Sequence, residues 1–415
     1  MRLGTPVAEA VARVVGVGAP IAFTAYDGSK AGPSDALVTV HIRSADALRY
    51  AVTAPGELGL ARAYVSGALE FDGDTYTLLG LLARDNVGDL SVPERLSVLR
   101  DLGLGVLRPI APPPEEARLR WRFGPVHGRR RDADAIHRHY DVSNRFYELV
   151  LGPTMAYTCA VYPRLDASLE EAQTEKVDLV CRKLGLQPGM RLLDVGCGWG
   201  TLVRHAAREY GVQALGVTLS RRQAEWARER IAAEGLTGAE VRHSDYRDVT
   251  DTGFDAIASI GLTEHIGRSR LGEYVRRLAG ALKPEGRLLN HCITQADSHS
   301  PANKKRGFIT RYAFPDGELS SPGAIVTALH DGGFEVRHTE NLREHYALTL
   351  RDWCRNLQEN WEEAVREAGA GRVRVWDLYM AGSRLGFDWN RLQLHQVLCT
   401  KTTNGRSGAP LRPDW

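Results

Sequence analysis

The chain has 415 residues, of which 43% are hydrophobic and 25% charged, with 53 Lys and Arg against 51 Asp and Glu. This is the composition of a folded protein, and the length allows two or three domains with sizeable cores. Because the formal net charge is only +2 and no run of about 18 apolar residues occurs, we expect neither a nucleic-acid-binding protein nor a transmembrane helix.

The N-terminus and the cysteines favour a cytoplasmic protein. The most apolar N-terminal segment, residues 11–22, is interrupted by Arg13 and follows no basic stretch, so we expect no signal peptide. The six cysteines show no CxxC spacing. This pattern favours reduced thiols over disulfides or structural zinc, and we predict no metal site.

Residues 1–110 are predicted to form a small α+β domain. Residues 36–42 alternate in polarity and are β-branched, as in a half-buried strand, and residues 76–84 and 92–104 have helical apolar spacing. Asp-Gly and Pro-Gly pairs separate these segments as turns. No catalytic pattern occurs in this region.

Residues 111–134 are predicted to be a linker. Three consecutive prolines near its start break regular structure. The linker carries a strong local positive charge, from Arg118, Arg120, Arg122, Arg129, Arg130 and Arg131.

Strands and helices alternate from residue 135 to residue 402, and residues 403–415 are predicted to be a disordered tail. The predicted strands are residues 191–195, 214–217, 241–243, 254–260 and 287–293. The predicted helices are residues 201–210, 221–234 and 271–282. Strands separated by helices imply βαβ units and therefore a doubly wound, mostly parallel sheet.

A glycine-rich loop, GCGWG at residues 196–200, joins the first of these strands to a helix. Glycine lets the backbone turn tightly and approach a ligand, and the helix N-terminus can face an anionic group. A dinucleotide loop would read GxGxxG, with an acidic residue about 20 positions on. Here the third glycine comes one position early and the next strand ends in TLS at residues 218–220. The pattern favours the amino-acid end of S-adenosylmethionine over NAD or FAD; a strand–helix turn without a ligand is the alternative.

Six motifs follow one another in this region: residues 139–147 (HYDVSNRFY), 157–159 (YTC), 193–200 (LDVGCGWG), 216–223 (GVTLSRRQ), 245–248 (DYRD) and 264–267 (EHIG). In these motifs the sequence resembles the cyclopropane-fatty-acyl-phospholipid synthase family, which includes the mycolic acid cyclopropane synthases. The resemblance covers residues 135–400. Residues 1–110 resemble, more weakly, the lipid-binding domain of the phospholipid-acting members.

The resemblance implies a Rossmann-like class I methyltransferase fold with a smaller N-terminal α+β lipid-binding domain. It also implies S-adenosylmethionine as methyl donor to a cis double bond of a lipid acyl chain. The residues that the resemblance assigns to the cofactor site are Tyr157, Thr158, Gly196, Gly198, Thr218, Leu219, Gln223, Tyr246 and His265. For Leu219, core packing is the alternative.

The family also holds a bicarbonate ion beside the sulfonium. By resemblance its ligands are Cys159, Glu264, His291, Ile293 and Tyr346. Each has an ordinary alternative when taken singly, such as packing for a cysteine. Together they are hard to explain as packing, because a buried acid, imidazole and phenol would each need a polar partner.

The implied chemistry explains why such a group is needed. An alkene is a weak nucleophile, so positioning supplies much of the rate, and water must be kept from the carbocation that forms on the chain. Bicarbonate would then serve as the base that removes a proton. Aromatic side chains can stabilise a cation; the candidates, for each of which ordinary core packing is the alternative, are Tyr140, Phe146, Tyr157 and Phe314.

Two products can arise from this cation: a cyclopropane, or, after a hydride shift, an exo-methylene chain that a separate reductase converts to a methyl branch. Residues 26–28, residues 56–67 and Glu148 resemble the actinobacterial branch that makes 10-methylene phospholipid chains. We therefore expect the 10-methylene product, with the cyclopropane as the alternative. Arg145 and Thr263 depart from the family's usual acidic residue and Phe, and we expect these departures to affect the substrate or the product.

The expected partners are membrane phospholipids with unsaturated acyl chains, the separate reductase and, in a homo-oligomer, further copies of the chain, but no nucleic acid. We expect peripheral association with the inner face of the cell membrane, through the linker arginines or through residues 304–306 (KKR). Solvated loop charge is the alternative. Two rival classes are a small-molecule or RNA methyltransferase on the same fold, and a lipid carrier without activity.

Overall fold

The computed structural model describes residues 5–16, 19–84, 97–98, 100–117, 127–129, 131–132, 142–299, 307–413 and 415. The chain divides into two compact units. The first unit comprises Met1–Leu119, Lys305–Pro315 and Trp361–Leu385. The second comprises Arg120–Lys304, Asp316–Asn360 and Gly386–Trp415.

This division differs from the predicted boundaries, because two segments beyond residue 135 belong to the first unit. Polar contacts inside that unit explain why. The buried carboxylate of Asp377 accepts hydrogen bonds from Tyr64 Oη at 2.8 Å and Thr75 Oγ1 at 2.7 Å. Glu116, which binds the Arg62 guanidinium, also accepts a hydrogen bond from Tyr312 Oη at 3.3 Å. Partners so distant in sequence give no local pattern that a linear reading can detect.

The first unit contains a four-stranded sheet in the order β2-β1-β3-β4, in which β1 and β3 are parallel and the other pairs antiparallel. Its strands are β1 (Ile21–Ala25), β2 (Lys30–Ala31), β3 (Val38–Ile42) and β4 (Leu69–Asp72). Its helices are α1 (Val7–Val15), α2 (Ala45–Thr53), α3 (Glu57–Val65), α4 (Thr75–Arg84), the 3-10 helix η1 (Leu104–Leu107), α13 (Phe308–Tyr312), α16 (Trp361–Ala368) and most of α17 (Ala370–Asp388). The strand and the first helix predicted here are both present. The helix predicted at residues 92–104 lies largely outside the described residues.

The second unit is built on a seven-stranded sheet in the order β10-β11-β9-β8-β5-β6-β7. β11 is antiparallel to both of its neighbours, β10 and β9, and the other described pairs are parallel, so the sheet is mostly parallel, as the sequence predicts. The strands are β5 (Arg191–Val195), β6 (Gln213–Thr218), β7 (Ala239–His243), β8 (Phe254–Ile260), β9 (Leu282–Gln295), β10 (Glu335–Asn341) and β11 (Leu392–Thr400).

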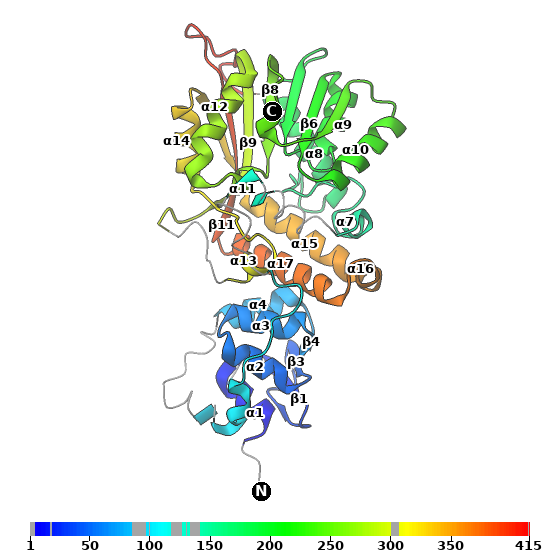
Figure 1. The fold of residues 1–415 in the computed structure, drawn as a ribbon, viewed down its shortest axis with the longest axis vertical. Helices are drawn as coiled ribbons and strands as arrows, with labels where there is room; N and C mark the ends of the chain where they lie inside the picture. Colours follow the sequence, from blue (N-terminus) through cyan, green and yellow to red (C-terminus); the bar gives the residue numbers. More distant parts are fainter. Residues whose placement is uncertain are drawn as a thin grey trace. The chain divides into compact units, whose positions relative to one another are not determined.

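Helices cover both faces of this sheet (Figure 1). The helices are α7 (Asn144–Leu151), α8 (Leu169–Leu184), α9 (Thr201–Tyr210), α10 (Arg221–Ala233), α11 (Thr263–Ile266), α12 (Leu271–Ala281), α14 (Pro322–Asp331) and α15 (Arg343–Glu359), with short 3-10 helices η3 (Tyr246–Asp248) and η4 (Arg268–Arg270). The predicted helices at residues 201–210, 221–234 and 271–282 correspond to α9, α10 and α12.

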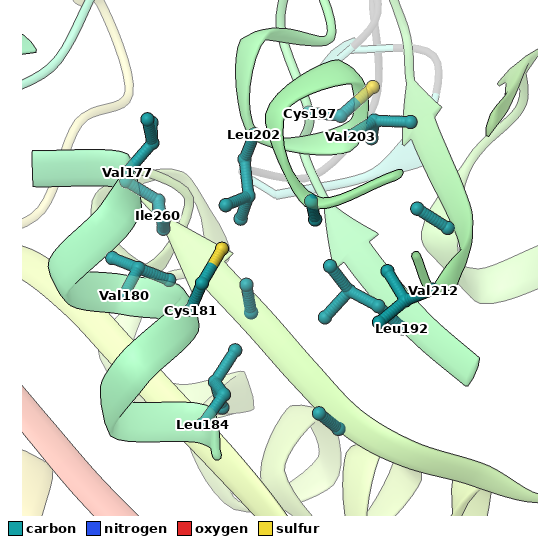
Figure 2. Packing of buried hydrophobic residues seen from close by; sticks show 14 of the residues in the cluster. Val177, Val180, Cys181, Leu184, Leu192, Cys197, Leu202, Val203, Val212 and Ile260 are labelled. Atoms are coloured by element: carbon teal, nitrogen blue, oxygen red, sulfur yellow. The ribbon is translucent and has the colours of Figure 1, made fainter. Parts of the chain in front are cut away.

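Alternation along the strands divides the core into two layers. Leu192 packs with α8, α9 and α10 on one face, whereas its neighbour Leu193 packs with α12 and α14 on the other. Figure 2 shows the first layer, where Val177, Val180 and Cys181 of α8 approach the strands. Both faces are therefore buried, which leaves the ends of the strands as the places where polar groups can meet a ligand.

The last residues make defined contacts where the sequence predicts disorder. Thr403 forms an isolated β-bridge with Arg406, and the ring of Trp415 lies 5.7 Å from that of His338 and packs against the first core layer. An aromatic residue at the end of a polar segment can anchor it.

Among the described residues, no helix combines the length and the apolar character needed to cross a membrane.

Candidate active site

The loop between β5 and α9 holds its glycines in conformations that other residues rarely adopt. Gly196, Gly198 and Gly200 have φ angles of +82°, +55° and +73°. The N–H groups of Gly196 and Cys197 both donate to the carbonyl oxygen of Val217 at 2.9 Å, which fixes the loop to β6. These positive φ angles explain why the loop needs glycine.

A cavity opens beside this loop, at the carboxyl ends of β5 and β8. Its lining comes from Met155, Ala156, Tyr157, Thr158, Lys176, Asp194, Gly196, Cys197, Gly198, Trp199, Thr201, Leu202, Gln223, Ile260 and Gly261. Five of the predicted cofactor residues are in this lining: Tyr157, Thr158, Gly196, Gly198 and Gln223. Ligands of doubly wound sheets bind at this end of the strands.

Of two further predicted cofactor residues, Thr218 contacts the lining and Leu219 follows it in sequence. Thr218 Oγ1 donates to Gln223 Oε1 at 2.8 Å, so Thr218 orients a side chain that faces the cavity. The backbone carbonyl of Leu219 accepts a hydrogen bond from His243 Nε2 at 3.1 Å. Both residues lie where the chain leaves β6 for α10.

Tyr246 and His265 are not part of the described lining of this cavity. Tyr246 packs edge-on against Tyr274, with ring centroids 5.2 Å apart. The carbonyl of His265 accepts a hydrogen bond from His127 Nδ1 at 3.1 Å, and burial lowers the pKa of the His265 imidazole to about 4. His265 is therefore neutral at physiological pH.

The sequence did not single out Lys176 as a site residue, although it is fully buried and lines the cavity with Asp194. Burial lowers the pKa of Lys176 to about 8 and raises that of Asp194 to about 7, and the attraction between the two groups opposes both shifts. Asp194 Oδ1 is buried without a hydrogen-bond partner among the described residues. The sequence signal is a lysine within the apolar stripe of α8, beside Val177 and Val180.

Glu264 and Ile293 are brought together by α11 and β9. The N–H of Ile293 donates to Glu264 Oε1 at 2.7 Å, while Glu264 Oε2 is buried without a hydrogen-bond partner among the described residues. Burial raises the pKa of Glu264 to about 7, and the Ile293 hydrogen bond opposes this rise. The carboxyl group can therefore gain or lose a proton near neutral pH.

His291 adjoins the cavity, since its carbonyl accepts a hydrogen bond from the N–H of Gly261, a lining residue, at 2.8 Å. Its Nδ1 lies 3.2 Å from Gln396 Nε2, and its Nε2 is buried without a partner among the described residues. Burial and the positive charges of Lys176 and Lys183 hold the pKa of His291 far below its ordinary value. The imidazole is therefore neutral.

Cys159 and Tyr346 both contact the backbone carbonyl oxygen of Leu342. Cys159 Sγ lies 3.8 Å from the carbonyl oxygen of Leu342, which also accepts a hydrogen bond from the N–H of Tyr346 at 3.1 Å. Burial raises the pKa of the Cys159 thiol, so it stays protonated and is a donor rather than a nucleophile. The Tyr346 ring packs against Phe387, with centroids 4.6 Å apart.

The two departures from the family pattern have different environments. Thr263 is buried and donates to Asn290 Oδ1 at 2.7 Å, next to Glu264. Arg145 is half exposed, with Nη1 3.5 Å from Glu148 Oε2. Of the two, Thr263 is the one that adjoins a residue of the predicted bicarbonate site, Glu264.

The predicted aromatic residues do not form one described cluster. Tyr140 lies outside the described residues. Phe146 is buried in α7 and packs edge-on against Tyr147, and Tyr157 lines the cavity. Phe314 belongs to the first unit, where it packs against Tyr379.

Two linker arginines are already paired within the second unit. Arg129 Nη1 lies 2.6 Å from Asp248 Oδ1, and Arg131 binds both oxygens of Asp316 at 2.6 Å. The other four linker arginines and residues 304–306 lie outside the described residues. The positive charge of Arg129 and Arg131 is therefore partly neutralised by acidic side chains.

Residues 127–397 match the protein family described as mycolic acid cyclopropane synthetase. The chain is 54% identical over 406 residues to a probable fatty acid methyltransferase of Mycobacterium tuberculosis, covering 95% of both chains. It is 37% identical over 388 residues to a probable fatty acid methyltransferase of Pseudomonas putida, covering 92% of both.

The chain also has solved structural relatives. The cyclopropane synthase MmaA2 from Mycobacterium tuberculosis is similar at a TM-score of 0.61 and 33% identity, covering 64% of this chain and 97% of that one. A mycolic acid cyclopropane synthase crystallised with SAH and CTAB gives the same TM-score, identity and coverage. With its class I methyltransferase sheet, its glycine loop and these matches, the chain belongs to the mycolic acid cyclopropane synthetase family, whose members are S-adenosylmethionine-dependent enzymes that modify lipid acyl chains.

Proposed function

We propose that the protein transfers the methyl group of S-adenosylmethionine to the cis double bond of unsaturated acyl chains in membrane phospholipids, through a carbocation on the chain. We further propose that the product is a 10-methylene chain, the precursor of a methyl branch. One observation carries the proposal: Glu264 and His291, next to the glycine-loop cavity, each have a buried polar atom without a partner among the described residues. Such atoms need a ligand or a water molecule to satisfy them.

The cavity fits the cofactor. When bound there, S-adenosylmethionine supplies an electrophilic methyl group. Its amino-acid end carries one positive and one negative charge, and the cavity offers the charged partners Asp194 and Lys176, with Asp194 Oδ1 unsatisfied. Gly196 and Gly198 let the ligand approach the backbone, and Gln223, held by Thr218, takes the place of an acidic ribose ligand.

The acid–base residues fit a small anion such as bicarbonate. The residues that would hold it are Cys159, Glu264, His291, Ile293 and Tyr346, and bicarbonate would supply a base there. The thiol of Cys159 can only act as a donor to an anion, because burial keeps it protonated. Glu264, with a pKa of about 7, can donate as a carboxylic acid or accept as a carboxylate.

The residues that would hold bicarbonate must also exclude water from the site. A carbocation reacts with water to form an alcohol, so the site must be dry until a proton is lost. Cys159, His291 and Glu264 are 0%, 1% and 9% exposed. Burial on this scale supports a site that keeps water from the acyl chain.

Product analysis tests the proposal. We would express the full chain in a bacterial host rich in oleoyl phospholipid and separate the fatty acid methyl esters by gas chromatography with mass spectrometry. We expect an ester one carbon heavier than oleate with an exo-methylene group. A cyclopropane ester as the sole new product would support the alternative, ring closure from the same cation. Absence of any new ester, with folded protein present, would reject methyl transfer to phospholipid chains.

We also propose that the protein docks peripherally on the cytoplasmic face of the membrane. Anionic head groups attract basic residues, each contributing about 1 kcal/mol near the surface. Because Arg129 and Arg131 are paired with carboxylates, the proposal depends mainly on Arg118, Arg120, Arg122, Arg130 and residues 304–306. Co-sedimentation with phosphatidylglycerol liposomes at low and high salt tests this proposal. Binding that survives neutralisation of both the four arginines and residues 304–306 would reject it.

A further inference from the structure

A row of polar side chains crosses the sheet beside His291. Glu340 of β10, Gln396 of β11 and His291 of β9 are direct cross-strand partners, so their side chains share one face of the sheet. Lys183 of α8 covers this row: its Nζ donates to Gln396 Oε1 at 2.7 Å and to a carboxylate oxygen of Glu340. Gln396 Nε2 lies 3.2 Å from His291 Nδ1. These contacts form one continuous chain from Glu340 to His291.

The donors and acceptors in this chain allow only one arrangement. An ammonium group has three donors and no acceptor, so the Gln396 atom next to Lys183 Nζ must be the amide oxygen. The amide NH₂ of Gln396 then faces His291, and an NH₂ group can only donate. His291 Nδ1 must therefore be the unprotonated acceptor. In a neutral imidazole the proton is then on Nε2.

We propose that Lys183 and Gln396 are positioning residues that hold His291 as the neutral tautomer with its proton on Nε2. This tautomer places an N–H donor on Nε2, the buried atom without a partner among the described residues. The identity of the acceptor that meets this N–H rests on the proposed function, in which it is an oxygen of bicarbonate. The tautomer itself does not rest on that function.

The charges around the chain stabilise this arrangement. Glu340 is about one-third exposed, whereas Lys183 is 0% exposed. Burial lowers the pKa of Lys183, and the hydrogen bond and the charge of Glu340 oppose this shift. The positive charges of Lys183 and Lys176 in turn oppose protonation of His291. Lys183 therefore orients Gln396, and its charge adds to the effect of burial and of Lys176 on the pKa of His291.

The choice of tautomer matters for an anion. With the proton on Nε2, His291 donates a hydrogen bond to an anion in the site. With the proton on Nδ1, it would present a lone pair to the same anion and repel it. Partners that orient a metal-binding histidine typically change metal affinity about 10- to 100-fold when removed, and we expect Gln396 to affect anion affinity on a similar scale.

The tautomer is measurable by NMR without any enzymatic activity. We would label the full chain selectively with ¹⁵N-histidine, record long-range ¹H–¹⁵N correlations of the imidazole rings, and assign His291 from the signals lost in His291→Asn. We expect the proton on Nε2 in the unsubstituted protein. A proton on Nδ1, or a mixture of both tautomers, would overturn the proposal.

The isosteric substitution Gln396→Glu tests the role of the amide. The introduced carboxylate can only accept, so it should draw a proton to His291 Nδ1 and weaken bicarbonate binding about 10- to 100-fold. Gln393→Glu is the matched control, because Gln393 is on the same strand and bonds instead to Asn390 Oδ1 at 2.8 Å. An unchanged tautomer in folded Gln396→Glu would overturn the role of Gln396. If that variant does not fold, the tautomer in the unsubstituted protein still decides the proposal.

Bicarbonate titration separates this inference from the proposed function. We would follow the His291 Nε2–H signal of the unsubstituted protein as bicarbonate is added at constant pH. A saturable shift supports both the tautomer and the anion site. A proton on Nε2 that does not respond to bicarbonate would reject the bicarbonate site and leave the positioning role of Lys183 and Gln396 intact.

Discussion

The cavity beside the glycine loop and the acid–base residues around Glu264 are neighbours, yet they are built in different ways. The glycine loop contributes residues 196–199 to the lining of the cavity, and the backbone of this loop is held by positive φ angles at Gly196 and Gly198. The acid–base group is made of side chains from α11, β9 and α15, whose properties depend on burial. Substitutions in the two regions should therefore change different quantities: cofactor affinity in the first, and proton transfer in the second.

Glu264→Gln should give the largest effect and separate the two regions most clearly. The amide cannot take up or release a proton, and general acid–base groups contribute about 100- to 10,000-fold to a rate. We therefore expect kcat to fall by at least about 100-fold, measured by methyl incorporation into phospholipid.

Binding of S-adenosylhomocysteine provides the control for this variant. Glu264 is not part of the described lining of the glycine-loop cavity. The affinity of Glu264→Gln for S-adenosylhomocysteine, measured by calorimetry, should therefore stay within about twofold of that of the unsubstituted protein. Unchanged turnover would show that the assignment of Glu264 is wrong. A parallel loss of cofactor affinity would show that the two regions are not independent.

The raised pKa of Glu264 also predicts how stability depends on pH. Between the unfolded pKa of about 4.5 and the folded pKa of about 7, the folded protein binds more protons at this group, so its contribution to stability falls as pH rises. The full difference corresponds to about 3 kcal/mol. Glu264→Gln removes this cost, and we expect the variant to gain stability relative to the unsubstituted protein from about pH 5 to about pH 8.

Urea denaturation at both pH values measures this effect. Asp194 has a pKa raised in the same direction, so only the difference between the variant and the unsubstituted protein reports on Glu264. Glu359→Gln, at an exposed position of α15, is the matched control and should leave the dependence unchanged. A variant that shows the same loss of stability as the unsubstituted protein would contradict a buried, raised pKa at Glu264.

The same contrast explains how much could be predicted from the sequence. The strands β5 and β8 have the predicted bounds, because runs such as residues 254–260 are short, mostly apolar and bounded by turn residues such as Gly253 and Gly261. The glycine loop could be predicted because the positive φ angles that require glycine belong to one short segment, residues 196–200. Lys176 was missed because its helix, α8, was not predicted, although Ser168 and Glu171 form a capping box at its start.

Residues whose role comes from long-range neighbours gave no sequence signal at all. Gln396 matters only because β11 returns between β9 and β10, which puts it beside His291, a partner 105 residues away. Asp377 likewise acquires its partners only when α17 packs with the N-terminal segments of the first unit. A side chain's type can be read from the sequence, but the atoms that satisfy it depend on the complete fold.

Gly196→Ala tests the backbone region, with a smaller expected effect. A left-handed conformation costs a residue with a Cβ about 1–2 kcal/mol, and the added atom would lie 3.4 Å from Leu262. We expect the loop to shift and the affinity for S-adenosylhomocysteine to fall about tenfold, equivalent to about 1.4 kcal/mol. Gly235→Ala is the control, since Gly235 has φ +64° and nothing within 4 Å. Equal affinity loss in both variants would contradict a local role for Gly196.

Thr263→Val should give the smallest effect, although Thr263 precedes Glu264. Its hydroxyl donates to Asn290 Oδ1 at 2.7 Å rather than to Glu264, so its loss should cost about 1 kcal/mol of stability and change kcat by less than about threefold. Urea denaturation and methyl incorporation measure the two quantities, and Thr263→Ser, which keeps the hydroxyl, should lie closer to the unsubstituted protein. If kcat of Thr263→Val falls as far as that of Glu264→Gln, the hydrogen bond from Thr263 to Asn290 also contributes to proton transfer. The acid–base group would then extend further from the cavity than Glu264, Ile293 and His291.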